Sequence, residues 1–388
     1  MANTLGSLVA PIYEALNSVS REFVGFIPGA QRDNGNFTRA AVGQKVTVPI
    51  VPPVVGADIV PGVTPPNDGD QVLGSTDLTI TKSRAFPIKW NGEEQLALEN
   101  SGAMLPPILR MQFQQAFRAA VNEVEQDLAL IAYKNASRAV GTPGTAPFGT
   151  AGDLSDFALS AKVLDENGAP AAPRRMIVNS DSMANLRGKQ SVLFKVNESG
   201  TDELLRRGRV GEVQGFDIGY SPGIKQVVKG TGANYVLAAG SYPAGTKSLT
   251  LATGTGTVNA GDVITLAGDA NKYVVAAGIS APGTITIQSP GLKVAHAAGD
   301  SVTVGASFTP NIAFTSDGLI LATRAPALPK RLDGSYGDGG VHQLIVDEFS
   351  GIAFDVGVYD MYRQVRFEVA LAWGVATPNP EHIALLMG

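Results

Sequence analysis

The sequence has no cysteine and only three histidines in 388 residues. The first absence excludes disulfide bonds and thiolate metal sites, so packing alone must stabilise the fold in any redox compartment. The histidines, His296, His342 and His382, are scattered, and none has the H-x3-H spacing typical of zinc ligands. We therefore expect neither a bound metal ion nor a cofactor.

Charge is also scarce. Lys, Arg, Asp and Glu make up 17% of the chain, the formal net charge is −5 and the pI is near 5.3. A dedicated nucleic-acid-binding protein needs a basic face that releases counterions, so this balance argues against that class, although local basic patches stay open. The hydrophobic content of 44% is typical of a well-folded globular protein.

Motifs for catalysis are missing too. The chain has no G-x-S-x-G nucleophile turn. Residues 240–248 (GSYPAGTKS) resemble a phosphate loop, but Thr246 separates the second glycine from Lys247, and a strand rather than a helix is expected to follow. Asp333 and Asp338, in a glycine-rich loop, lack the spacing of a calcium-binding loop. We predict no catalytic, cofactor-binding or metal site, and a protein that is not an enzyme.

The N-terminal segment lacks the features of a signal peptide or a membrane span. Residues 1–24 have no basic residue before their apolar stretch, and Glu14, Arg21 and Glu22 interrupt it before about 20 apolar residues accumulate. Apolar residues recur at helical spacing, which predicts an amphipathic helix that ends near residues 28–29. We interpret this segment as an arm that docks on another surface.

Residues 231–310 are nearly free of charge, with three Lys and three Asp against 59 charged residues in the other 308. Short alternating runs of Val, Ile, Thr and Leu, closed by Gly, Pro or Asn, predict strands. These runs are 248–251, 263–266, 273–275, 284–287 and 302–304. The pattern predicts an all-β domain inserted into a loop of a host domain, with its two ends close together.

A long loop at residues 50–76 separates two predicted strands, 45–49 and 77–82. It contains five prolines, three aspartates (Asp58, Asp68 and Asp70) and no lysine or arginine. Prolines stiffen an extended path, and loops of this length are usually functional or disordered. We predict an acidic arm that protrudes from the body.

The longest periodic segment, residues 108–134, predicts a helix of about 40 Å, long enough to be a spine across the molecule. From residue 153 the pattern alternates a helix, a strand at 176–178 and a second helix at 179–186. A later strand, 319–322, is expected to return to this α/β part.

Two late apolar runs, 344–352 and 365–373, are expected to complete the sheet that begins with residues 45–49. Both ends of the chain would then lie in one domain. The predicted fold class is α+β.

The order of these parts resembles the major capsid (coat) protein of tailed bacteriophages, in the short-tailed-phage branch that carries an inserted β-domain. The resemblance spans nearly the whole chain and depends on order and spacing rather than on one motif. The stretches that carry it are AAVGQKVTVP (40–49), DENGAPAAPRRMIVN (165–179), RVGEVQGFDIGYSP (209–222) and RFEVALAWGVATPNPEHIALL (366–386).

The resemblance implies a division into domains and a function. The parts would be an N-terminal arm (1–44), a peripheral domain (45–152, with extended loop 50–76 and spine helix 108–134, and 344–388), an axial domain (153–230 and 311–343) and an inserted β-domain (231–310). Copies would assemble as hexamers and pentamers into an icosahedral shell that encloses double-stranded DNA. The implied location is the virion capsid, assembled in the host cytoplasm, with no membrane contact.

The resemblance also implies partners. A portal protein is expected, whether a decoration protein also binds stays open, and the packaged DNA would make only weak, non-specific contacts. Some members of the family cross-link through a lysine in the extended loop, but residues 50–76 contain none, so non-covalent contacts are expected here. The chain runs from Met1 almost directly into the arm, which favours a separate scaffolding protein.

Two alternatives stay open: the shell protein of an encapsulating nanocompartment with the same fold, and a surface adhesive protein that uses its β-domain. Within the capsid interpretation, we expect contacts between identical subunits through opposite charges. The candidate residues are Asp58, Asp68 and Asp70 of the acidic loop and Arg206, Arg207 and Arg209 of the densest basic cluster.

Overall fold

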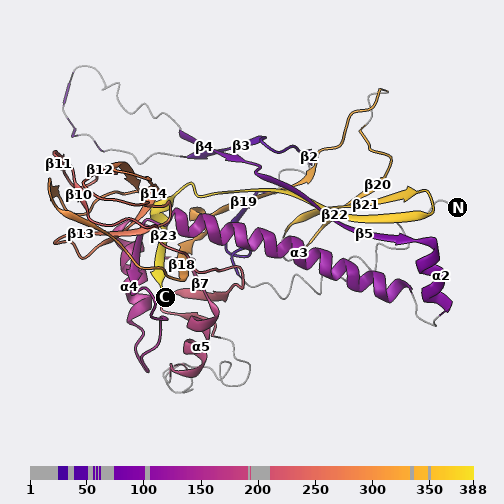
Figure 1. The fold of residues 1–388 in the computed structure, drawn as a ribbon, viewed down its shortest axis with the longest axis horizontal. Coiled ribbons are helices and arrows are strands. Elements are labelled where there is room, and N and C mark those ends of the chain that lie inside the picture. Colours follow the sequence, from indigo (N-terminus) through magenta and orange to yellow (C-terminus); the bar gives the residue numbers. More distant parts are fainter. Residues whose placement is uncertain are drawn as a thin grey trace.

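The computed structural model describes residues 25–33, 39–50, 56, 58–59, 61–62, 74–100, 105–190, 193, 210–332, 336–347 and 351–388. Within them the predicted α+β class is confirmed. The long helix α3 (Leu105–Lys134) runs along the molecule, with a cluster of short strands at one end and long paired strands at the other (Figure 1). The helix predicted within residues 1–24 lies outside the described residues.

Helix α3 buries one face because its apolar residues recur every three or four positions. Phe113, Phe117, Val124 and Leu128 on this face are each at most 1% exposed. At 1.5 Å per residue, its 30 residues extend ~45 Å. The helix therefore forms where the sequence predicts a spine.

Helix α3 packs on a seven-stranded sheet whose central strand is β22. β22 pairs with β5 along one edge, and with β21 and then β19 along the other. Phe117 of α3 packs edge-on against Phe354 of β21, with ring centroids 5.0 Å apart. The strands are β1 (Gln31–Asp33), β2 (Arg39–Ala40), β5 (Lys82–Asn91), β19 (Ile320–Pro326), β20 (Val341–Val346), β21 (Ala353–Met361) and β22 (Gln364–Ala376). The short helix α2 (Gly92–Asn100) follows β5.

The strands on either side of the long loop pair with each other. β3 (Lys45–Ile50) and β4 (Gly74–Thr79) form a separate antiparallel ribbon in which Val46 lies opposite Leu78. The expectation that residues 45–49 begin the main sheet is therefore wrong, because β4 ends at Thr79 and the next strand, β5, takes the place beside β22.

A second sheet runs in the order β6-β23-β18-β7-β9-β8. Helices α4 (Ser155–Glu166) and α5 (Ser180–Gly188) pack on it, because Phe157 and Met183 share a buried cluster with Met176 and Phe216 of the strands. The strands are β6 (Arg138–Gly141), β7 (Arg174–Val178), β8 (Glu212–Val213), β9 (Phe216–Tyr220), β18 (Pro310–Thr315) and β23 (Ile383–Met387). Short 3-10 turns at Ser316–Gly318 and Pro380–His382 precede β19 and β23.

Two strands lie in a different sheet from the one expected. Residues 319–322 lie in or next to β19, which pairs with β22 of the first sheet. β23, near the C-terminal end, pairs with β6 and β18 of the second sheet. Both strands are buried on both faces, so their apolar patterns fit either sheet, and only the path of the chain in space decides between them.

The predicted inserted β-domain is a closed barrel. Its strands pair in the order β13-β17-β10-β12-β15-β14, and β14 pairs back with β13. They are β10 (Tyr235–Leu237), β12 (Ser248–Ala252), β13 (Val263–Leu266), β14 (Lys272–Ala277), β15 (Gly283–Ile287) and β17 (Ser301–Val304), with β11 (Ser241–Tyr242) and β16 (His296–Ala297) as a small separate pair. Closure removes the free strand edges that an open sheet would expose.

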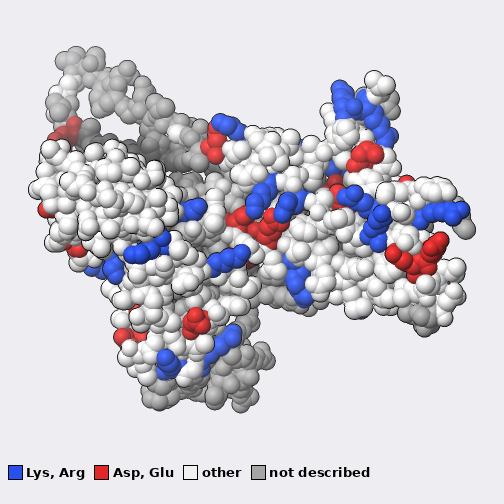
Figure 2. All heavy atoms as spheres, viewed as in Figure 1, with Lys and Arg blue, Asp and Glu red and all other residues white. Residues whose placement is uncertain are grey.

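The barrel has its own core and a narrow connection to the host. One cluster of buried side chains lies wholly between Tyr235 and Val304. The chain enters and leaves the barrel side by side, since Val227 N donates to Phe308 O at 2.8 Å. Figure 2 shows few charged side chains over the barrel, in keeping with its composition. The two ends of the insert are therefore adjacent, as an insertion into a loop requires.

Candidate functional site

The structure describes only one of the six predicted contact residues. Asp58 is exposed, whereas Asp68, Asp70, Arg206, Arg207 and Arg209 lie outside the described residues. The opposite-charge contact between copies therefore stays a prediction.

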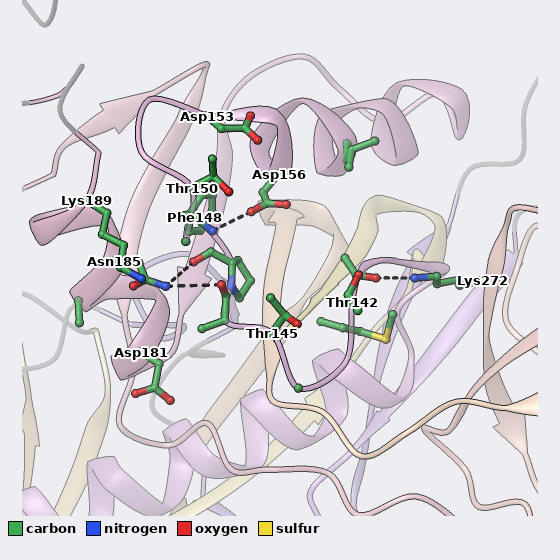
Figure 3. Close-up of a pocket in the computed structure, with 18 residues that line it drawn as sticks. Thr142, Thr145, Phe148, Thr150, Asp153, Asp156, Asp181, Asn185, Lys189 and Lys272 are labelled. Atoms are coloured by element: carbon green, nitrogen blue, oxygen red, sulfur yellow. Dashed lines mark hydrogen bonds between the residues drawn. The ribbon is translucent and has the colours of Figure 1, made fainter.

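A hollow lies beside the loop that links β6 to α4 (Figure 3). It measures about 990 Å³ and is open to solvent on one side. Asp156 accepts a hydrogen bond from Phe148 N at 2.7 Å, and Asn185 donates one to Pro147 O at 3.0 Å. Lys272 donates to Gly141 O. These polar side chains hold the loop in place, so they are occupied by protein partners rather than aimed at a substrate.

Each of the three histidines pairs with aspartate. The pairs are His296 with Asp269 and Asp300, His342 with Asp338 and Asp355, and His382 with Asp317. Thr315 donates its hydroxyl proton to Asp317, but among the described contacts no serine or threonine hydroxyl is hydrogen-bonded to a histidine ring, as a hydrolytic triad requires.

Asp338, considered above for calcium, is bound by protein donors. Tyr359 donates its hydroxyl proton to Asp338 at 2.7 Å, and His342 Nε2 lies 2.9 Å from the other carboxylate oxygen. Burial acts to raise the pKa of Asp338, but these hydrogen bonds hold the pKa well below its ordinary value. Asp333 lies outside the described residues.

Two further features bear on binding. Within the described part of the chain, no group of three or more His, Cys, Asp or Glu side chains is placed to hold a metal ion. None of the described helices is both long and apolar enough to cross a bilayer.

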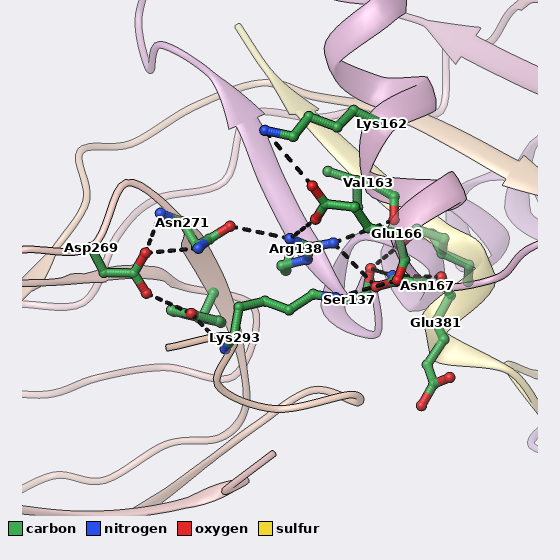
Figure 4. Close-up of polar contacts among 12 residues, drawn as sticks. Ser137, Arg138, Lys162, Val163, Glu166, Asn167, Asp269, Asn271, Lys293 and Glu381 are labelled. Atoms are coloured by element: carbon green, nitrogen blue, oxygen red, sulfur yellow. Dashed lines mark hydrogen bonds and ion pairs between the residues drawn. The ribbon is translucent and has the colours of Figure 1, made fainter. Parts of the chain in front are cut away.

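A buried arginine joins the barrel to the second sheet (Figure 4). Arg138 of β6 is 2% exposed, and its Nη1 lies 2.7 Å from Glu166 Oε2 at the end of α4. The same nitrogen donates to Asn271 Oδ1, at the start of β14, at 3.1 Å. Nη2 donates to Asn167 Oδ1 at 3.1 Å. One guanidinium therefore binds the host and the barrel at once.

The backbone reinforces this junction. β14 of the barrel pairs with β6, with Tyr273 opposite Arg138 and Lys272 opposite Ala139. Gln288 donates its amide proton to Lys134 O, the last residue of α3, at 3.0 Å. The barrel is thus connected to the body by strand pairing as well as by side chains.

A buried carboxylate joins α3 to two other segments. Glu125 is fully buried and accepts hydrogen bonds from Phe26 N at 3.0 Å, Ile27 N at 3.2 Å and Ser221 Oγ at 3.1 Å. Burial raises the pKa of Glu125, and the three donors only partly offset this effect. The carboxylate thereby fixes residues 26–27, within the predicted N-terminal arm, and the loop that follows β9.

Comparison with solved structures finds similarity over most of the chain. The capsid of cyanophage P-SCSP1u is 11% identical with a TM-score of 0.49, over 92% of this chain and 86% of that chain. A structure from Mycobacterium phage Che8 is 13% identical with a TM-score of 0.45, over 89% and 84%. A virus-like particle from Pyrococcus furiosus is 12% identical with a TM-score of 0.43, over 98% and 99%.

Phage capsids are among the structures to which this chain is similar. A scan against protein families and a search of curated proteins find no match.

The sequence analysis did not identify Arg138 or Glu125. Arg138 lies among small and apolar residues in the run ASRAV, and Glu125 lies among polar residues in the run NEVEQ. A charged residue at such a position is also typical of a solvated face, so the pattern alone does not show that its partners lie 25 or more residues away.

Proposed function

We propose that this chain is the major capsid protein of a tailed phage, whose copies assemble as hexamers and pentamers into an icosahedral shell around double-stranded DNA. One observation supports the assembly role above the others. The described residues of the long loop, at 56, 58–59 and 61–62, are all exposed, and the apolar Ile59 is 96% exposed. An extended loop with a bare apolar side chain is stabilised when a neighbouring subunit covers it.

In this proposal the domains keep the boundaries given above, except that β19 of the axial segment pairs in the first sheet and β23 of the peripheral segment pairs in the second. The partners are identical subunits, a separate scaffolding protein and a portal protein, and the presence of a decoration protein stays open. Contacts with the packaged DNA are weak and non-specific, because the net charge of −5 leaves little excess positive charge to bind phosphates. The place of action is the virion capsid, assembled in the host cytoplasm.

Electron microscopy of the protein co-expressed with its neighbouring genes tests the proposal. We expect closed polyhedral particles with five-fold and six-fold clusters of subunits. Closed particles that package a protein cargo, and not DNA, would identify a nanocompartment shell instead. Persistent monomers would contradict every shell function.

The acidic loop is proposed to contact the arginine cluster of a neighbouring copy. Reversing the charges of Arg206, Arg207 and Arg209 should then weaken the shells at low salt, because the contact is electrostatic and salt screens it. Shells of unchanged stability at both low and high salt would remove this contact from the proposal.

A further inference from the structure

Large apolar side chains are exposed to solvent on two separate surfaces near the end of the molecule that carries α2. The first lies between β19 and β20, where Leu332 is 110%, Tyr336 68% and Val341 55% exposed. The second lies around α2, where Leu96 is 59% and Tyr362 85% exposed. Because both places are exposed in one subunit, they do not cover each other within it.

The first place is the end of a projecting segment, which we call the arm tip (residues 329–332 with Tyr336). In Figure 1 the chain between β19 and β20 projects away from the sheets. Lys330 bridges antiparallel to Tyr336, and Gly337 N donates to Pro329 O at 3.1 Å. Arg331 Nε donates to Gly337 O at 3.2 Å. These hydrogen bonds fix the backbone of the arm tip, so the exposed side chain of Leu332 is held in a defined position.

The second place, which we call the distal hollow, lies between α2 and the turn that joins β21 to β22. It measures about 780 Å³. Its lining includes the apolar side chains Trp90, Leu96, Met361, Tyr362 and Val365. A hollow of this size has room for several side chains of a partner.

Helix α2 forms one wall of the distal hollow, although it has no buried residue. Its start is well capped, because Asn91 Oδ1 accepts from Glu94 N at 2.7 Å while Glu94 Oε2 accepts from Asn91 N at 3.1 Å. A nine-residue helix is marginal in water unless one face is packed. We therefore expect α2 to become more stable when another surface packs against it.

The two surfaces carry opposite charge. The arm tip presents Lys330 and Arg331, whereas Glu93 and Asp360 line the distal hollow. α2 adds further acidic residues and no basic one, and Arg363, also in the lining, lies over the Tyr362 ring at 5.5 Å. Figure 2 shows basic side chains on the projecting segment and acidic ones near α2. Opposite potentials favour the encounter of these two surfaces.

We propose that the arm tip of one copy seats in the distal hollow of a second copy, with Leu332 among the apolar side chains and Lys330 and Arg331 against Glu93 and Asp360. The occupant is a second copy because every chain carries both surfaces, and a head-to-tail contact of this kind satisfies both on every subunit in a ring or closed array. The contact rests on the proposed function, since it joins subunits of a shell.

A cysteine pair tests the contact directly, because the natural chain has no cysteine to interfere. L332C combined with L96C should give covalent multimers when assembled particles are oxidised, and monomers after reduction, since a disulfide forms only between Cα atoms less than about 7 Å apart. L332C combined with Y362C provides a second position on the hollow. The matched control is L332C with V228C, whose native valine is 74% exposed elsewhere.

Multimers from at least one hollow pair, with none from the control, support the contact. The proposed contact would be overturned if neither hollow pair gave covalent multimers, or if the control pair gave as many multimers as the hollow pairs. If the wild-type chain forms closed shells while the hollow pairs stay monomeric, only this contact fails. If the wild-type chain itself forms no shells, the proposed function fails first.

Charge reversal gives an independent test. K330E/R331E and E93K/D360K should each lower the yield of shells roughly tenfold through like-charge repulsion, and the combined variant should restore it to within about threefold of wild type. If K330E/R331E and E93K/D360K each lower the yield of shells and the combined variant does not restore it, these charges act elsewhere. The proposed pairing would then be wrong.

Discussion

At the scale of single residues, the carboxylate of Glu125 is unusual because its described partners are neutral donors rather than a cation. Burial makes the folded protein hold the proton of this group more tightly than the unfolded chain does. A raised pKa of a carboxyl group means that ionisation opposes folding. The free energy of unfolding should therefore fall as pH rises from the ordinary value of 4.5 to the raised pKa.

The variant E125Q should lack this pH-dependent loss. It should also be less stable overall by about 1–3 kcal/mol, because an amide has one acceptor oxygen and its NH2 group faces backbone donors. Chemical unfolding of the unassembled subunit between pH 4.5 and 8 measures both effects. S221A removes one donor to the carboxylate and should extend the loss to higher pH. Parallel pH profiles for wild type and E125Q would contradict this account.

At the scale of elements, α3 is held by its buried face and by ion pairs at its edge. Lys82 of β5 lies 2.8 Å from Asp127 of α3, whose other oxygen accepts from the Trp373 indole at 2.9 Å. Such half-exposed ion pairs each contribute little, about 0–1 kcal/mol, whereas each buried side chain contributes several-fold more. The apolar face therefore dominates.

Two leucines two positions apart on α3 test this difference. Leu128 is 0% and Leu130 44% exposed, so L128A should lower the free energy of unfolding by about 2–5 kcal/mol and L130A by less than about 1 kcal/mol. Denaturant titration of the unassembled subunit compares them. Equal losses would mean that α3 is not anchored through this face.

Local periodicity predicted the elements that depend on near neighbours. The strands at 248–251, 263–266, 273–275, 284–287 and 302–304 all form, as do α3 and α5. Tyr235–Leu237 was missed because three residues are too few to show alternation. The partners of β19 and β23 were also missed, because pairing between distant strands depends on the path of the chain and not on local composition.

At the scale of the whole molecule, a polar junction centred on Arg138 joins the barrel to the body, beside the pairing of β14 with β6. Removing this side chain would leave Asn271, Asn167 and the Val163 carbonyl without their shared donor. Breaking such a buried charged network is costly because its remaining members stay desolvated.

R138M should therefore lower the free energy of unfolding by about 3–5 kcal/mol and speed hydrogen exchange in β6 and β14. K162M is the control. Lys162 is 67% exposed and lies 3.7 Å from the same Glu166, so its loss should cost less than about 1 kcal/mol. Hydrogen exchange measured by mass spectrometry on both variants separates a junction effect from a general one. Similar exchange in R138M and wild type would show that strand pairing alone holds the barrel.

One continuous core runs the length of α3, from Phe113 beside β22 to Ala132, and reaches Val274 in the barrel. A rod packed along its whole length resists bending, so mechanical load applied near α2 is passed to the barrel instead of being absorbed midway. In the particle proposed above, a change of curvature should then be taken up mainly where subunits meet and not by bending of α3.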